Sequence, residues 1–548
     1  MKAVISAALI AEPGLHPPPV RGGRSGRDPI IDLERNDRRE SAEDARKLNA
    51  GILGGFARLF TGAVIGKVLG LVRELALAAL FGTGTVASAL RASQTATLIP
   101  AQFVTGETLS AGLVPLLVRY RRDDPARATA LFRAVSVLLF LFSAVATIAI
   151  VLGARAWASI LFPGFSAAAL NTTVQLLGIM ALGIPFYVQS AMFWYWEMAC
   201  GGYALAAARP AVQNLGMLLG IVIAWQTGNP LWLAWGFTAA YVALCALSPI
   251  WLSGTLRGSH AGRVSRGETL AALSAFGREV RFLLLLPILF QAGIAIERIL
   301  ASLLGDATVA SVDYAKVLVE TGLAVFALPL GLASVAELSR TGVDSIRHRI
   351  SSLLPLLLAL SVPVSAALVV HGPLVVDAFY ARGAFDAESV RITSQVLIGL
   401  GVGLWAQLAT YVLAKGMSAQ LRNREMVRCM AIGLVVATVV QLLLWRSLGA
   451  LALGLGVSVG AIVQLTLVAR AVGIGNALVR HCSLLIPLAA FYALAAELLL
   501  RGDETVAAAA GLFVAWWGLV ALLHPGSRTW LMARARARRS GRRERMES

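Results

Sequence analysis

The chain alternates between long apolar segments and short stretches rich in Gly, Pro and charged residues. From Gly51 onward the apolar segments are roughly 20 residues long, which is the length a helix needs to cross a hydrocarbon core about 30 Å thick. We predict fourteen membrane-spanning helices, near 52–81, 86–118, 131–153, 171–197, 205–226, 230–253, 280–304, 308–338, 351–371, 389–414, 428–446, 449–469, 481–500 and 505–523. The pattern predicts an all-α polytopic membrane protein.

The segments that flank and divide these spans differ in composition. Residues 1–50 combine a Pro-rich stretch with nine basic and eight acidic residues, which is typical of a disordered extension. We predict the following organisation: a cytoplasmic extension at 1–50, an N-terminal six-helix lobe at 51–253, a cytoplasmic linker at 254–279, a C-terminal six-helix lobe at 280–470, two extra spans at 471–525 and a basic cytoplasmic tail at 526–548.

Basic residues are unevenly divided between alternate loops. One set of loops, with the C-terminal tail, holds 27 Lys and Arg, whereas the opposite set holds only Arg155, Arg382, Arg446 and Arg501. Cytoplasmic loops carry the excess of positive charge in membrane proteins. We therefore expect a multi-pass protein of the cytoplasmic membrane with both termini in the cytoplasm.

Composition supports a membrane protein and excludes several other classes. Of 548 residues, 57% are hydrophobic and 14% charged, whereas about a quarter of a soluble protein is charged. The net charge of +18 follows from the loop bias, so no nucleic-acid partner is expected. The four cysteines are far apart and contain no CxxC, so we expect neither a disulfide framework nor a metal site, and we predict no cofactor.

An internal repeat indicates how the spans are organised. Eight of the twelve residues in Leu77–Ser88 are identical to those in Leu300–Ser311, which follows 223 residues later. Both copies join two predicted helices through a short turn that contains glycine, and six spans separate them. Chance similarity between Ala/Leu-rich helices is the alternative. The repeat predicts two parallel halves, an arrangement that places a transporter's site at the interface between the halves.

Charges inside spans identify the candidate site. Each costs roughly 2.5–3.5 kcal/mol on insertion scales, so such groups tend to face a bundle interior or a wet cavity. They concentrate in the repeat-equivalent spans 1, 2, 7 and 8, which predicts a solvated cleft there. The basic candidates for binding a substrate are Lys67, Arg73, Arg91, Arg298 and Lys316, and the acidic candidates for ion coupling are Glu107, Glu297, Asp313 and Glu320.

Spacing leaves alternatives open for several of these groups. Asp313, Lys316 and Glu320 can share one helix face and neutralise one another. Arg73 and Glu74 could extend to the membrane interface, and Arg91 could do the same or line the cavity. No HExxH, GxSxG or Walker A pattern is present, so we expect no enzyme activity, and His371 is interpreted as solvated near an interface.

Several ordered motifs carry a resemblance to a known family. The segment Gly66–Pro115 (GKVLGLVRELALAALFGTG…ETLSAGLVP), the segment Glu297–Glu320 (ERILASLLGDATVASVDYAKVLVE) and Phe379–Val390 (FYARGAFDAESV) are similar to sequences of the lipid II flippase (MurJ/MviN) family. That family belongs to the multidrug/oligosaccharidyl-lipid/polysaccharide exporter superfamily. The resemblance covers about residues 52–480. It implies two six-helix lobes around a cationic central cavity, two further C-terminal helices, and export of an undecaprenyl-pyrophosphate-linked glycan by alternating access.

The family's charged positions match only in part. Lys67 and Arg73 stand where the family has basic residues in its first helix. An acidic residue, an adjacent basic pair and a helix 8 Arg of the family fall on uncharged residues here: Ser88, Ala101 with Gln102, and Val317. Because a pyrophosphate requires several charge-assisted donors, we expect Arg298 and Lys316 to substitute.

These observations predict a flippase that moves lipid II or a specialised polysaccharide precursor from the inner to the outer leaflet. Its partners would be the lipid-linked glycan, membrane lipids and cell-envelope biosynthesis proteins, and its energy would come from an ion gradient or the membrane potential. Two alternatives remain: a transport-inactive scaffold for envelope biogenesis, and a cation-coupled drug or solute exporter.

Overall fold

The computed structural model describes residues 61–62, 64–257, 265–281, 285–338, 343–419, 422–500 and 505–524, and no strand occurs among them. The predicted extension at 1–50 and the predicted tail at 526–548 lie outside the described residues. An all-helical architecture confirms the predicted fold class.

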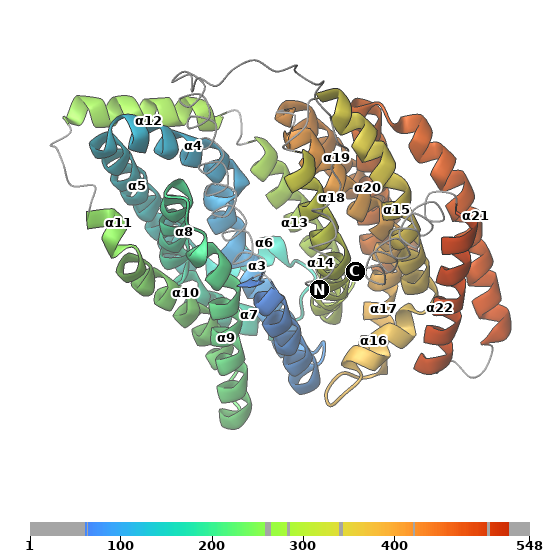
Figure 1. Ribbon diagram of the computed structural model, residues 1–548. Helices are drawn as coiled ribbons and strands as arrows, with labels where there is room; N and C mark the ends of the chain where they lie inside the picture. The colour runs from blue at the N-terminus through green and yellow to red at the C-terminus, as the bar shows by residue number, and fades with distance from the viewer. Residues whose placement is uncertain are drawn as a thin grey trace, which may run out of the picture. The chain divides into compact units, whose positions relative to one another are not determined.

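The N-terminal half, residues 64–257, begins with a helix over 64–81. The following helices are α3 (Thr85–Thr105), α4 (Glu107–Asp123), α5 (Pro125–Leu152), α6 (Ala154–Leu161), α7 (Ala167–Ala181), α8 (Ile184–Ala199), α9 (Ala204–Thr227), α10 (Leu231–Trp251) and the short α11 (Ser253–Arg257). Helix α12 (Arg266–Arg281) lies in the predicted linker and packs on α4 and α5 (Figure 1).

The C-terminal half, residues 285–472, repeats this order. It contains α13 (Leu285–Leu303), α14 (Asp306–Leu338), α15 (Val343–Val370), α16 (Gly372–Tyr380), α17 (Ala387–Gly401), α18 (Leu404–Ala419), α19 (Asn423–Leu448) and α20 (Ala450–Val472). Two more helices, α21 (Gly475–Leu499) and α22 (Val506–Leu523), pack on α15 and on each other (Figure 1).

Equivalent helices of the two halves share their irregularities. The fourth segment of each half is broken: α7 and α8 meet at 44°, and α17 and α18 meet at 49°. The third segment of each half ends in a short separate helix, α6 or α16. Two halves with the same order and the same breaks are what a parallel repeat predicts.

Small residues allow close packing of the last two helices in each half. In α9 and α10, a Cβ at Gly220 would lie 2.6 Å from the Trp232 carbonyl oxygen, and in α19 and α20 a Cβ at Gly460 would lie 2.5 Å from the Gly433 carbonyl oxygen. Backbones that approach so closely are typical of helix pairs in membranes. Glycine is therefore required for packing at these positions.

The part of the chain that the structure describes has six helices long and apolar enough to cross a membrane: α5, α9, α10, α19, α20 and α21. The count reaches nine if each of three bent pairs, α7 with α8, α15 with α16, and α17 with α18, forms one span. The total of fourteen spans stays a prediction.

Two predictions about single residues have different outcomes. His371 is not solvated: its exposed fraction is 4%, and its Nε2 lies 2.7 Å from the Tyr492 hydroxyl of α21. The sequence could not show that α21 covers this position. All four cysteines lie in described segments as free thiols, and the absence of a disulfide framework stays a prediction.

Candidate functional site

The candidate site lies where the first two helices of each half meet. Helix 64–81 turns into α3 at Gly82, and α13 turns into α14 at Gly305; both glycines have a positive φ, of 56° and 125°. Helix α3 also packs directly on α13 and α14. The repeated segments of the sequence therefore face each other across the two halves.

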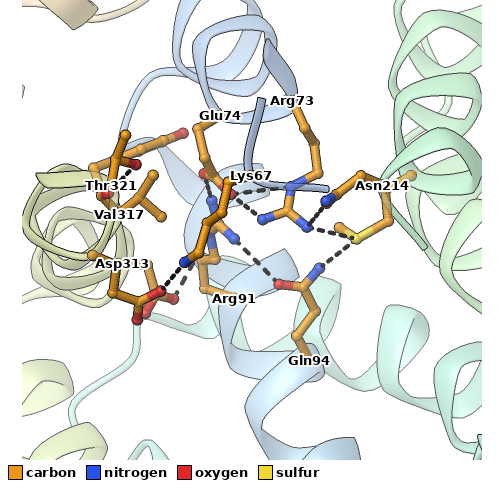
Figure 2. Close-up of polar contacts among 12 residues, drawn as sticks. Lys67, Arg73, Glu74, Arg91, Gln94, Asn214, Asp313, Val317 and Thr321 are labelled. Atoms are coloured by element: carbon orange, nitrogen blue, oxygen red, sulfur yellow. Dashed lines mark hydrogen bonds and ion pairs between the residues drawn. The ribbon is translucent and has the colours of Figure 1, made fainter. Parts of the chain in front are cut away.

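Five charged side chains form an alternating row at this meeting point, and we call it the charge row: Arg73, Glu74, Arg91, Asp313 and Arg298. Glu74 accepts hydrogen bonds from both Arg73 and Arg91, and Asp313 accepts one from Arg298. The row thus runs from helix 64–81 through α3 to α14 and α13. Figure 2 shows Arg73, Glu74 and Arg91 converging, with Asp313 on the side of Arg91 that is away from Arg73.

Most of the charge row is shielded from solvent. The exposed fractions of Glu74, Arg91 and Arg298 are 0%, 4% and 6%. A buried ion is stable only when it is paired and hydrogen-bonded. Strict alternation of sign supplies those partners, which explains why three guanidinium groups can lie so close together.

Arg91 joins the two halves. Its Nε lies 3.8 Å from Oδ2 of Asp313, and its guanidinium lies 5.5 Å from the centre of the Tyr314 ring. Tyr314 in turn donates a hydrogen bond of 3.0 Å to the carbonyl oxygen of Gly82. The charge row is therefore anchored in both halves.

Arg73 is held from its other side by α9. Its Nη1 donates to Oδ1 of Asn214 at 2.8 Å, and Asn214 donates to the Gly66 carbonyl oxygen, also at 2.8 Å. A Cβ at Gly66 would lie 2.5 Å from Cβ of Pro210, so glycine allows helix 64–81 to approach α9. These contacts fix the orientation of Arg73.

Two further ion pairs accompany the charge row. Lys67 Nζ lies 2.8 Å from Oε2 of Glu320, which joins the two halves, and these side chains are 45% and 57% exposed. Lys316 pairs with Glu297 within the C-terminal half. All five predicted basic residues thus have a carboxylate partner, and the site combines five cations with four carboxylates.

The structure resolves two of the alternatives that spacing left open. Asp313, Lys316 and Glu320 do not pair with one another, because each finds a partner on another helix. Glu74 and Arg91 do not extend to an interface, because they are buried against each other. The side chain of Glu107 lies outside the described residues.

The positions that depart from the family pattern are uncharged and take other roles. Ser88 is fully buried, and its hydroxyl donates to the carbonyl oxygen of Thr83 at 3.1 Å, within the turn before α3. Ala101 is buried, whereas Gln102 and Val317 are partly exposed. Charged residues lie close to two of these positions: Arg91 follows Ser88 by three residues in α3, and Asp313 precedes Val317 by four residues in α14.

Glu74 is the central residue that sequence reasoning missed. Its position next to Arg73 predicted only that it could extend to the membrane interface, although at the repeat offset of 223 residues Glu74 corresponds to Glu297. Each of these carboxylates pairs with a cation of the next helix, Arg91 or Lys316. The repeat offset was the signal that could have identified it.

The two halves also meet in a second region, the junction, formed by the turns at 82–84, 162–166, 304–306 and 381–386. The Ala384 amide donates to the Ala79 carbonyl oxygen at 2.8 Å, and the Ser166 amide donates to Asp306 at 3.0 Å. In chain order, each of these turns follows an odd-numbered predicted span. The predicted span order thus assigns all four turns of the junction to the same side of the membrane.

Parallel repeated halves, broken spans and a charged interface between the halves define a secondary transporter of the membrane. The family model described as "Lipid II flippase MurJ" matches residues 77–516, and the chain belongs to this family.

Similar proteins agree with this assignment. A "Probable lipid II flippase MurJ" of Synechocystis is 26% identical over 381 residues, which cover 64% of this chain and 68% of that protein. Another "Probable lipid II flippase MurJ", of Rhizobium tropici, is 26% identical over 408 residues, which cover 70% of this chain and 74% of that protein.

Solved structures share the fold. A structure described as "Lipid II flippase MurJ, inward closed conformation" superposes with a TM-score of 0.70 at 15% identity, covering 85% of this chain and 98% of that one. An inward-facing transporter of the multidrug resistance MATE family superposes with a TM-score of 0.61 at 15% identity, covering 77% of this chain and 96% of that one.

Proposed function

We propose that the protein is a flippase that carries an undecaprenyl-pyrophosphate-linked glycan, lipid II or a specialised polysaccharide precursor, from the inner to the outer leaflet. Membership of the MurJ family and the similarity to probable lipid II flippases support this substrate class. The observation that carries the proposal is the row of buried arginines between the two halves. Guanidinium groups make strong paired hydrogen bonds to phosphate oxygens.

The proposed mechanism is alternating access by movement of one half against the other. The 27 basic residues of one loop set support a cytoplasmic location for that face and for both termini. The junction then closes the outer face. In this state a head group would enter from the cytoplasmic side, while its prenyl tail stays in the lipid.

The exposed fraction of each cation in the site suggests its role in binding the substrate. Lys67 and Lys316 are the most exposed cations of the site, so they would make the first contacts with a pyrophosphate. Arg73, Arg91 and Arg298 lie deeper and would hold it as the halves move. For ion coupling, Glu297, Asp313 and Glu320 remain candidates together with Glu107, because protonating a paired carboxylate would release its cation.

A second candidate function is a transport-inactive scaffold for envelope biogenesis. The observation that favours it is the complete internal pairing of the five cations. Retaining nine charged groups in the membrane without transport would be costly, which favours the flippase.

Depleting the protein and measuring which leaflet exposes lipid-linked glycans tests the proposal. We expect one lipid-linked species to accumulate on the cytoplasmic side, and we expect a Lys67→Ala/Arg73→Ala variant to fail to restore export. An unchanged distribution after depletion would favour the scaffold. Restoration of export by the variant would remove the two cations from the binding site.

A further inference from the structure

The contact between Arg91 and Asp313 is the weakest link of the charge row. The other neighbours in the row are joined by hydrogen bonds, whereas Arg91 Nε and Asp313 Oδ2 are 3.8 Å apart, beyond hydrogen-bond distance. This link is also where the row passes from the N-terminal half to the C-terminal half. Separation of the halves would therefore break the row here first.

Two strong donors beside this link have no acceptor. Among the described residues, the Nε groups of Arg91 and Arg298 are buried and make no hydrogen bond. Both arginines contact the same carboxylate, Asp313. A buried guanidinium N–H without an acceptor is costly, so the row has unused capacity to bind a further anionic oxygen.

On the basis of the proposed function, we propose that Asp313 is an internal substitute for the substrate's phosphate. In the empty protein its carboxylate occupies the position between Arg91 and Arg298. An incoming pyrophosphate displaces Asp313 and takes both arginines, including their Nε donors. Binding of the anion thereby breaks the direct link between Arg91 and Asp313 and prepares the halves to move.

Asp313 suits this role better than Glu74. Glu74 is completely buried and holds two arginines within the N-terminal half. The side chain of Asp313 is 18% exposed, and it is hydrogen-bonded to Arg298 alone among the arginines. Displacement of Asp313 by a phosphate therefore breaks fewer contacts than displacement of Glu74 would, and it acts at the interface between the halves.

The test measures binding of undecaprenyl pyrophosphate to the full-length protein in phosphatidylcholine nanodiscs. We expect Asp313→Asn to lower the Kd at least fivefold, because the internal competitor loses its charge, and we expect Asp313→Glu to bind like the wild type. In a protein that also carries Arg91→Gln, Asp313→Asn should no longer lower the Kd. Unchanged or weaker binding by Asp313→Asn overturns the inference.

The matched control is Asp306→Asn. Asp306 is also a carboxylate that joins the halves, through the amide and hydroxyl of Ser166, but it contacts no arginine in the described structure. We expect its Kd for undecaprenyl pyrophosphate to equal that of the wild type. A gain equal to that of Asp313→Asn would mean that loosening the halves, and not vacating an anion position, increases affinity.

A second measurement does not depend on folding of the Asp313 variant. Nitroxide labels at Gln226→Cys and Ser447→Cys, exposed positions in different halves, report the distance between the halves of an otherwise wild-type protein whose native cysteines are replaced. Undecaprenyl pyrophosphate should shift this distance, and binding without a shift overturns the inference.

The outcomes also separate this inference from the proposed function. If the wild type binds no undecaprenyl pyrophosphate, the proposed site fails as well. If the wild type binds it and only the effects of Asp313 are missing, the proposed function stands.

Discussion

At the scale of residues, Glu74 determines whether the charge row can exist. It is the carboxylate shared by Arg73 and Arg91, and it has no solvent contact. Removing one partner of a buried ion pair leaves an uncompensated charge and costs about 3–5 kcal/mol. We expect Glu74→Gln to lower the thermal unfolding midpoint in detergent markedly.

The control for this prediction is Glu388→Gln. Glu388 also pairs with an arginine, Arg391, but both side chains are more than half exposed. Because water already solvates such a pair, its loss should leave the unfolding midpoint unchanged. Equal midpoints for the two variants would contradict the importance of the buried row.

Sequence reasoning identified four of the five residues of the charge row, but neither Glu74 nor the partner of each charge. Arg73, Arg91, Arg298 and Asp313 were recognisable because charge inside an apolar span is costly. The partners depend on which turns of four separate helices face one another, and helical spacing describes only contacts within one helix. Spacing therefore allowed Asp313 to be neutralised by Lys316, three residues away, whereas in the structure it pairs with Arg298 of α13.

At the scale of elements, the junction depends on backbone contacts at glycine. Gly383 precedes α17, has a φ of 63°, and a Cβ there would lie 2.2 Å from the Ala79 carbonyl oxygen of the other half. We expect Gly383→Ala to separate the halves at the junction. The distance between labels at positions 226 and 447 should increase.

Gly449 supplies a matched control within one half. Its φ is 57°, and a Cβ there would meet nothing within 4 Å. Both substitutions place alanine at a positive φ, which costs about 1–3 kcal/mol, but only Gly383→Ala adds the clash with Ala79. An equal change in distance for Gly449→Ala would show that strain alone, and not the contact at Gly383, alters the spacing of the halves.

The start of α17 illustrates what local sequence does predict. Asp386 accepts hydrogen bonds from the amide and hydroxyl of Ser389 at 2.8 and 2.6 Å, and these bonds hold the pKa of its carboxyl below the usual value. Such caps follow from neighbouring residues. Helix breaks depend on tertiary packing, so the sequence predicted 389–414 as one span where the structure has α17 and α18.

At the scale of the whole molecule, the repeat explains the order of the helices, and charged residues that the repeat does not share connect the two halves. The repeat of Leu77–Ser88 in Leu300–Ser311 predicts two parallel halves, and the helices of the two halves follow the same order with breaks at equivalent places. It could not predict that Arg91 and Asp313, which have no charged counterpart at the repeat offset, would meet across the interface. The central claim is that this meeting point is the transport site.

Transport of an undecaprenyl-pyrophosphate-linked glycan across proteoliposomes that contain the purified protein tests this claim most directly. We expect the wild type to transport the glycan under an imposed ion gradient, Arg91→Gln to transport it at least tenfold more slowly, and Arg391→Gln, which alters an exposed arginine of α17, to retain the wild-type rate. A wild-type rate for Arg91→Gln, or no transport by the wild type beyond protein-free vesicles, would contradict the account.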